Sequence, residues 1–95
     1  MNRKEFTDSL ELNTCPANMD DLLKVLWYIK KDNWEEAHNL ADGMPGSIAE
    51  WLHALLHRIE GDKWNANYWY KRAGREYPEI STDNEWEVIF SKCID

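Results

Sequence analysis

Two amphipathic runs joined by a short Gly-Asp turn occupy residues 48–77, and they limit the fold more than any other part of the chain. In the first run, large apolar residues recur at helical intervals of three and four, and they are Ile48, Trp51, Leu52, Leu55, Leu56 and Ile59. After the turn, a second such face is formed by Ala66, Trp69, Tyr70, Ala73 and Tyr77. Gly61 suits the end of one helix and Asp62 the start of the next. The stretch therefore predicts a helical hairpin, with small residues such as Ala54 where the two backbones approach.

Helical periodicity continues on both sides of this hairpin. Residues 18–43 predict an earlier hairpin, residues 83–94 a terminal capping helix, and residues 1–14 either a short helix or an arm. No apolar run alternates with a period of two over the length of a strand. We therefore expect an all-α single domain of two stacked antiparallel helical hairpins plus flanking helices.

The two predicted hairpins carry a faint internal repeat. The run DNW at residues 32–34 recurs as DKW at residues 62–64, an offset of thirty, whereas alignment of Ala37 with Ala66 gives an offset of twenty-nine. The sequence leaves this one-residue difference open. It predicts two successive hairpins, without predicting that they are identical tandem copies.

Charge and composition narrow the range of partners. The net charge of the 95 residues is −7 at pH 7, which argues against nucleic acid because binding a polyanion begins with a basic surface. We also expect no membrane segment and no signal peptide, since no apolar run is long enough for either. Cys15 and Cys93 lack the spacing of a disulfide framework or a zinc knuckle. The expected compartment is the cytoplasm.

The second hairpin resembles one unit of the tetratricopeptide class of helical-hairpin repeats. The residues that carry the resemblance are Gly61-Asp62, Asn65-Ala66, Trp69-Tyr70, Ala73 and Pro78. The resemblance implies a right-handed α-α array in which the first helix of each hairpin lines a concave surface. His53 departs from the family, which usually carries an apolar residue there, and the earlier hairpin is shorter than the usual unit.

The run HALLHRIEGDKWNANYWYKRAG, at residues 53–74, also resembles a small, mostly bacterial family of proteins of unknown function. That family shares this pattern of histidine, arginine, asparagine and aromatic residues. The resemblance implies no activity. It indicates that the polar residues of the stretch characterise one type of protein and are more than solubilising choices.

Polar residues of the central helix are the first candidates for a binding site. Glu50, His53 and His57 fall on the side of the helix opposite its apolar stripe, so in a stacked array they would line the concave surface. The earlier hairpin would border them with Lys24, Trp27 and Tyr28. Imidazole, aromatic and charged groups together suit a peptide or a small polar ligand.

The same side chains are the only candidates for a metal site, although we expect no metal or other cofactor. Two histidines four residues apart can present imidazoles to one divalent ion, and Glu50 could be a third ligand. The helix lacks the glutamate next to the first histidine that zinc proteases carry. A solvated or partner-facing pair is the alternative. His38 is predicted to be a core histidine bonded to a neighbouring helix.

Trp64, Tyr68 and Arg72 form a second candidate surface. They recur at intervals of four on the other side of the second helix, where two aromatic rings and a guanidinium could recognise a partner. The alternative is that they pack against Trp86 and Phe90 of the terminal helix.

Motifs of catalysis are missing from the sequence, which has no Gly-rich phosphate loop, nucleophile elbow or paired-carboxylate motif. The sequence therefore predicts a non-catalytic module that binds a protein, a peptide or a small ligand. The alternative is a metal-binding or small-molecule-transforming protein that uses Glu50, His53 and His57. A homodimer is also open, because a short array leaves an apolar end that needs cover.

Overall fold

Six helices make up the computed structural model, which describes residues 1–94, and no β-strand occurs in that range. They are α1 (Arg3–Ser9), α2 (Asp21–Lys30), α3 (Trp34–Ala41), α4 (Ser47–Ile59), α5 (Lys63–Arg72) and α6 (Thr82–Cys93). The expected all-α fold class is confirmed. Within residues 1–94, no helix combines the length and the apolar character that a membrane crossing requires.

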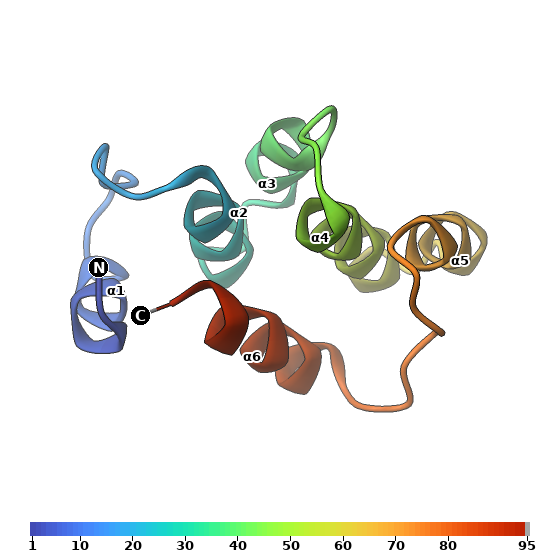
Figure 1. Cartoon of the computed structure of the whole chain (residues 1–95). Helices are drawn as coiled ribbons and strands as arrows, with labels where there is room; N and C mark the ends of the chain where they lie inside the picture. Colours follow the sequence, from blue (N-terminus) through green and yellow to red (C-terminus); the bar gives the residue numbers. More distant parts are fainter. Residues whose placement is uncertain (95) are drawn as a thin grey trace.

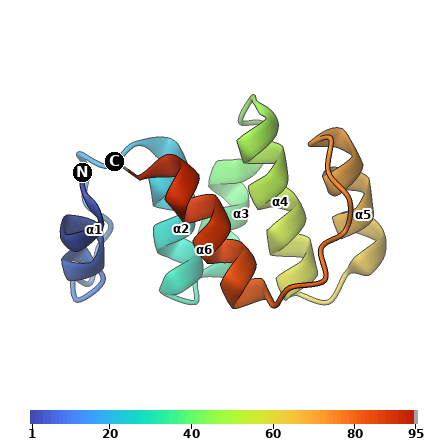
Figure 2. The same cartoon turned by 60° about the horizontal axis from the view of Figure 1, so that its bottom comes forward.

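The helices α2, α3, α4 and α5 pack against one another in chain order, and α6 crosses back over α2 and α4 (Figure 1, Figure 2). α3 lies on the side of α2 and α4 that faces away from α6 (Figure 1). α1 stands at the α2 end of the molecule, close to the C-terminal end of α6 (Figure 1). Consequently α4 is the central helix, with α2, α3, α5 and α6 packed around it.

Burial extends around the whole of α4, because every residue from position 51 to position 57 is buried. The apolar side of the helix contributes Leu52, Leu55 and Leu56 to the core. Ala54 of α4 and Ala66 of α5 are both fully buried, as expected for small residues where two helix backbones approach closely. The polar side of α4 is therefore buried as well, and it is covered by α3 and α5.

The turns before α3 and before α5 are alike. Asp32 and Gly61 both have a positive φ, 61° and 86°, and each precedes the capping residue of the next helix, Asn33 or Asp62. In both turns the N–H of the capping residue donates to a carbonyl five residues earlier at 2.9 Å. The structural offset between the hairpins is therefore twenty-nine residues, the value given by Ala37 and Ala66 in the sequence.

Helix α5 ends at Arg72, whereas the predicted second hairpin continued to residue 77. Gly74 adopts φ of 74°, and its N–H and that of the next residue donate back to carbonyls of the last helical turn. A left-handed glycine after the last turn satisfies these carbonyls and stops the helix. The helix therefore ends before Pro78 can interrupt it.

The N-terminal segment, which the sequence left as a helix or an arm, contains the helix α1. Asn2 and Glu5 form a reciprocal capping box at its start. Phe6 is buried against α6, with ring centroids 4.6 Å from Phe90 and 6.0 Å from Trp86. The helix is thus held by its cap and by one large aromatic anchor.

A buried carboxylate ties α6 to α4 and α5. Glu85 of α6 is only 1% exposed, and its Oε2 accepts hydrogen bonds from Trp51 Nε1 at 2.9 Å and from the Tyr70 hydroxyl at 2.6 Å. Its Oε1 accepts from Arg58 Nη1 at 2.7 Å. Burial and the bond to Glu85 raise the pKa of Tyr70. Every polar atom of this buried group therefore has a partner, as buried charge requires.

Candidate functional site

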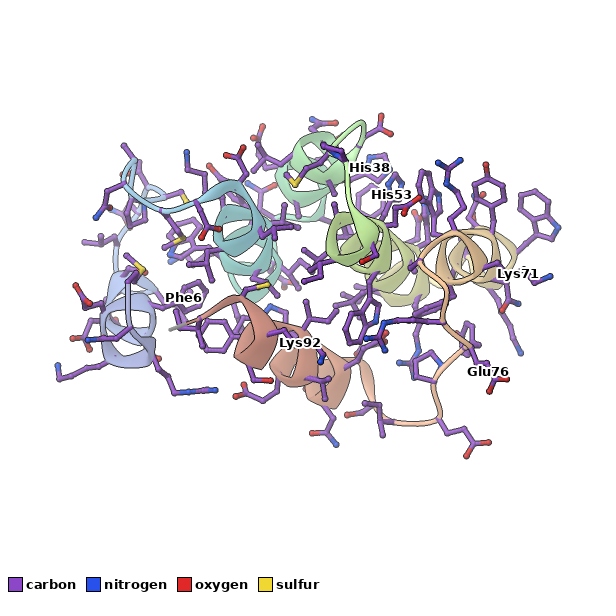
Figure 3. All side chains as sticks on the ribbon, in the orientation of Figure 1. Phe6, His38, His53, Lys71, Glu76 and Lys92 are labelled. Atoms are coloured by element: carbon purple, nitrogen blue, oxygen red, sulfur yellow. The ribbon has the colours of Figure 1, made fainter. Side chains whose placement is uncertain are left out.

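The three histidines of the chain meet between α3, α4 and α5. His38 comes from α3, and His53 and His57 come from successive turns of α4; Figure 3 shows His38 and His53 side by side on the face away from α6. One ring nitrogen of each histidine lies within 4.8 Å of the others. The ring centroids are 4.7 Å apart for His38 and His53 and 5.0 Å apart for His53 and His57. We call these three residues the histidine cluster.

Local sequence explains how the cluster forms. His53 and His57 are four residues apart, which places them one turn apart on the same side of α4. The loop at residues 42–46 returns the chain so that α3 packs against this side and brings His38 to it. The three imidazoles thus come from adjacent helices in the chain, and no distant segment is needed to assemble them.

Two indole rings pack against the cluster. Trp69 of α5 stacks on His53, with centroids 3.8 Å apart and planes 10° apart. Trp34 of α3 stacks on His38 at 4.8 Å and 8°. As a result His53 is only 3% exposed and His57 only 9%, while His38 is half-buried. The most accessible member of the cluster is therefore His38.

Hydrogen bonding within the cluster is incomplete. The Nδ1–H of His57 donates to Glu60 Oε2 at 2.7 Å. Within residues 1–94, the ring nitrogens of His38 and His53 make no hydrogen bond, and none of them is sealed away from solvent. Because these nitrogens reach solvent, water can serve them, and they are not buried unsatisfied groups. Both imidazoles therefore keep nitrogen atoms open to water or to a bound ligand.

The electrostatics of the cluster keep its most buried member neutral. Burial lowers the pKa of His53 to about 4, and the adjacent His38 and His57 add to the effect, while Asp42 opposes it. At neutral pH the His53 ring is therefore uncharged and has one nitrogen with a free lone pair. A neutral imidazole is the form of histidine that binds metals.

A cavity of about 390 Å³ adjoins the cluster. The loop between α3 and α4, including Gly46, forms one wall, and His53 and Trp69 form another. Arg72 and Glu50 complete the lining, and Arg72 Nε donates to Glu50 Oε2 at 2.8 Å. A volume of this size is within the range of small-ligand sites.

The set of residues that the structure brings together differs from the predicted one. His53 and His57 stay together, but they are buried where the sequence predicted a solvent-facing or partner-facing surface, because α3 and α5 cover this side of α4. Glu50 turns to Arg72, and His38 takes its place beside the two histidines. A signal for this was present, since all three histidines lie within twenty residues on two predicted consecutive helices.

The predicted border on the earlier hairpin lies elsewhere. Trp27 is buried and donates its Nε1–H to Ser9 Oγ at 3.2 Å, and the ring of Tyr28 meets Trp27 edge-on at 5.2 Å. No hydrogen bond or ring contact described for residues 1–94 joins Lys24, Trp27 or Tyr28 to a histidine. The physical reason is that Trp27 turns toward Ser9 at the end of α1. The sequence did not predict whether this N-terminal segment packs on the other helices.

The second predicted surface lies on the outer side of α5. Trp64 is 76% exposed and its ring is nearly parallel to that of Tyr68, with centroids 6.4 Å apart. Arg72 Nη1 donates to the Tyr68 hydroxyl at 3.3 Å. The alternative, packing against Trp86 and Phe90 of the terminal helix, does not occur: Trp64 and Tyr68 are exposed, and no ring contact described for residues 1–94 joins them to α6.

The candidate site is thus a group of three imidazoles beside a small cavity. At least one imidazole is held neutral by burial, and two of them are each stacked on an indole ring. Its donor atoms are all imidazole nitrogens, and the type of donor atom indicates which metal ions a site prefers. Comparison of the chain with models of protein families, with curated proteins and with solved structures gives no match.

Proposed function

We propose that the protein is a small ligand-binding module and that its ligand is one divalent transition-metal ion held by the histidine cluster. One observation carries this proposal. Three imidazoles converge, and two of them have ring nitrogens with no hydrogen-bond partner in residues 1–94. A metal ion satisfies all three rings at once.

The donor set fits the chemistry of such an ion. Imidazole nitrogen suits zinc, copper, iron and nickel. Three protein ligands with a fourth position left to water or substrate are typical of catalytic zinc sites. Bonds of about 2.0–2.1 Å to a tetrahedral ion place the nitrogens about 3.3 Å apart. The nitrogen atoms now lie up to 4.8 Å apart, and ring rotations that move each nitrogen by about 1 Å would bring them to the spacing of a tetrahedral site.

Glu60 supports the proposal from outside the donor set. Its carboxylate accepts the Nδ1–H of His57, so the lone pair of that ring lies on Nε2. A carboxylate behind a ligating histidine fixes the ring and raises its basicity. Glu60 and Asp62 also lie within 4.8 Å of His57, but Asp62 already caps α5 by accepting the N–H of Asn65. The three histidines are therefore the better donor set.

Titration of the untagged protein with Zn²⁺ and Co²⁺ tests the proposal. We expect one ion per chain, and an affinity at least about tenfold lower in each of His38→Gln, His53→Gln and His57→Gln, because each removes one nitrogen ligand. The matched control is Glu50→Gln, on the same helix, because the Glu50 carboxylate binds Arg72 and lies outside the donor set. It should keep the wild-type affinity.

Calorimetry gives the affinity and stoichiometry, and circular dichroism verifies that each variant is folded. Loss of affinity in Glu50→Gln equal to that in the histidine variants would point to a general charge effect. Binding that survives removal of two histidines would contradict the proposed donor set.

A second candidate function, docking of a protein or peptide partner, is favoured by the exposed Trp64 and Tyr68 on α5. Aromatic residues and arginine dominate the binding energy of many interfaces, and Arg72 adjoins this pair. Capture from native extract with wild type and with Trp64→Ser/Tyr68→Ser tests it. A protein retained by both samples alike contradicts docking here, and sedimentation of the wild type tests for a second copy as the partner.

Two further expectations belong to the proposal. The equivalent turns of the two hairpins support kinship with tetratricopeptide arrays, of which this protein would be a short example. Cys15 and Cys93 are both free thiols, which supports a reducing compartment such as the cytoplasm.

A further inference from the structure

We propose that the cavity beside the histidine cluster binds a small oxyanion, a carboxylate or phosphate group, which completes the coordination of the metal ion. This inference rests on the proposed metal site. It adds the oxyanion as a second ligand and places that ligand in the cavity. It also names Arg72, which lies outside the donor set, as the residue that recognises the oxyanion.

The charge of the metal site favours an anion. Three neutral imidazoles bring no negative charge to a divalent ion, and the nearby carboxylates Glu60, Asp62 and Asp42 lie outside the donor set. Glu50, the carboxylate that lines the cavity, is already paired with Arg72. An anion that enters the coordination sphere of the ion would therefore supply the only charged ligand, in a partly buried environment where charge interactions are strong.

The cavity meets the cluster at His53. This residue is buried, has no hydrogen-bond partner in residues 1–94, and lines the cavity of about 390 Å³. Trp69 lines the same cavity and stacks on His53, so the imidazole is held at its wall. A small ligand in this space would therefore lie next to an ion bound to His53, where it could take the position that three protein ligands leave open.

Arg72 is a prepared anion donor at the same cavity. Its Nε donates to Glu50 and its Nη1 to the Tyr68 hydroxyl, and these two bonds fix the plane of the guanidinium. Its Nη2 has no acceptor within residues 1–94. A guanidinium held in this way directs its remaining N–H groups at a carboxylate or phosphate oxygen.

The start of α4 adds positive potential to the cavity. Gly46 is the capping residue of α4 and offers no side-chain acceptor, whereas the other five helices described in residues 1–94 each have a side-chain cap. Gly46 lines the cavity, so the first N–H groups of this thirteen-residue helix lie at its edge. Helix N-termini attract anions. Together with a metal ion held by the unpartnered His53, this would place positive groups on two walls of the cavity.

The test uses the whole protein loaded with Co²⁺, whose visible absorption reports a change of ligand at the metal. Acetate and inorganic phosphate are titrated separately, with chloride at equal ionic strength as the control. We expect a saturable spectral change with at least one oxyanion and none with chloride. The oxyanion that gives the change distinguishes a carboxylate ligand from a phosphate ligand.

Arg72 variants locate the oxyanion. Arg72→Gln should raise the dissociation constant of the oxyanion about tenfold while leaving Co²⁺ affinity unchanged, and Arg72→Lys should fall between it and wild type because it keeps the charge but loses the planar fork. The matched control is Arg75→Gln, since Arg75 is exposed and stacks over Trp51, outside this cavity. It should behave as wild type.

The outcomes separate this inference from the function on which it rests. If Co²⁺ does not bind, the metal site itself is contradicted. If Co²⁺ binds but neither oxyanion changes the spectrum, the metal site stands and the oxyanion site is overturned. Equal weakening in Arg72→Gln and Arg75→Gln also overturns it, because the anion would then respond to overall charge.

Discussion

Single side chains differ widely in how much of the structure depends on them, and Glu85 is the clearest case. Its buried carboxylate accepts hydrogen bonds from Trp51, Tyr70 and Arg58. Glu85→Ala leaves the Arg58 charge and two other donors without their acceptor. We expect it to lower the free energy of unfolding by about 3–5 kcal/mol, as removal of one partner of a buried ion pair does. Urea denaturation measures this.

The control for this prediction lies two residues away on the same helix. Glu87 pairs with Arg3 at the surface, and both side chains are about half exposed. Exposed pairs contribute little, so Glu87→Ala should cost less than about 1 kcal/mol. Similar costs for the two substitutions would contradict a special role for the buried carboxylate.

His53 gives the metal-free protein a pH-dependent stability. Its pKa is about 4 in the folded protein and is ordinarily 6.5, so the unfolded chain binds more protons between these values. Stability is therefore full above this window and falls as pH drops through it. We expect a loss of roughly 2 kcal/mol between about pH 7 and pH 5.

Urea denaturation in the presence of a chelator measures this dependence. His53→Gln, which cannot take up the proton, should lose most of the slope. The neighbouring groups His38, His57 and Asp42 are retained in both proteins, so they act as an internal control. An unchanged slope in the variant would assign the dependence to another group.

At the scale of helices and turns, the equivalent positions Asp32 and Gly61 make a paired prediction. Both have positive φ, which glycine adopts freely and a residue with a side chain adopts at a cost. A Cβ at Gly61 would meet no atom within 4 Å, so the cost of Gly61→Ala is conformational alone. We expect Gly61→Ala to destabilise by about 1 kcal/mol and Asp32→Gly to be neutral or to stabilise by up to about 1 kcal/mol.

Thermal unfolding of the two single variants measures the pair. The reciprocal signs are the informative part, because a turn that tolerates any residue would give the same small change at both positions. Destabilisation by Asp32→Gly would show that the aspartate side chain contributes an interaction that outweighs its backbone cost.

Elements were easier to predict from the sequence than their surroundings. Spacings of three and four residues identify the helical character of the chain because a helix repeats every 3.6 residues. The apolar Leu52 and Leu55 are buried, as that pattern predicts. The apolar pattern does not predict the end of α5, because Tyr77 continues that pattern, whereas Gly74 ends the helix before it.

The candidate site was only half predictable for a related reason. A helical wheel ranks the residues of one helix by polarity, but it does not count the helices packed around it. Because α4 is central, its polar side is covered too, and His53 and His57 are buried. The third histidine, His38, lies on another helix, so its approach depends on the packing angle between α3 and α4, which periodicity does not encode.

For the whole molecule, an ion at the histidine cluster should stabilise the folded state, because it links His38 of α3 to His53 and His57 of α4. A ligand at about 100 times its dissociation constant stabilises the folded state by about 2.7 kcal/mol. For a domain of this size we expect a rise in Tm on the order of 10 °C. Thermal denaturation with Zn²⁺, and again after a chelator is added, measures it, and His38→Gln should show no rise.

The central position of α4 has an evolutionary consequence. Trp51 and Arg58 on one side of this thirteen-residue helix hold the carboxylate that anchors α6, while His53 and His57 on the other side belong to the histidine cluster. Substitutions on the histidine side leave the anchor of α6 in place. Selection can therefore change what the protein binds without rebuilding its scaffold, and the two traits can drift independently along a single helix.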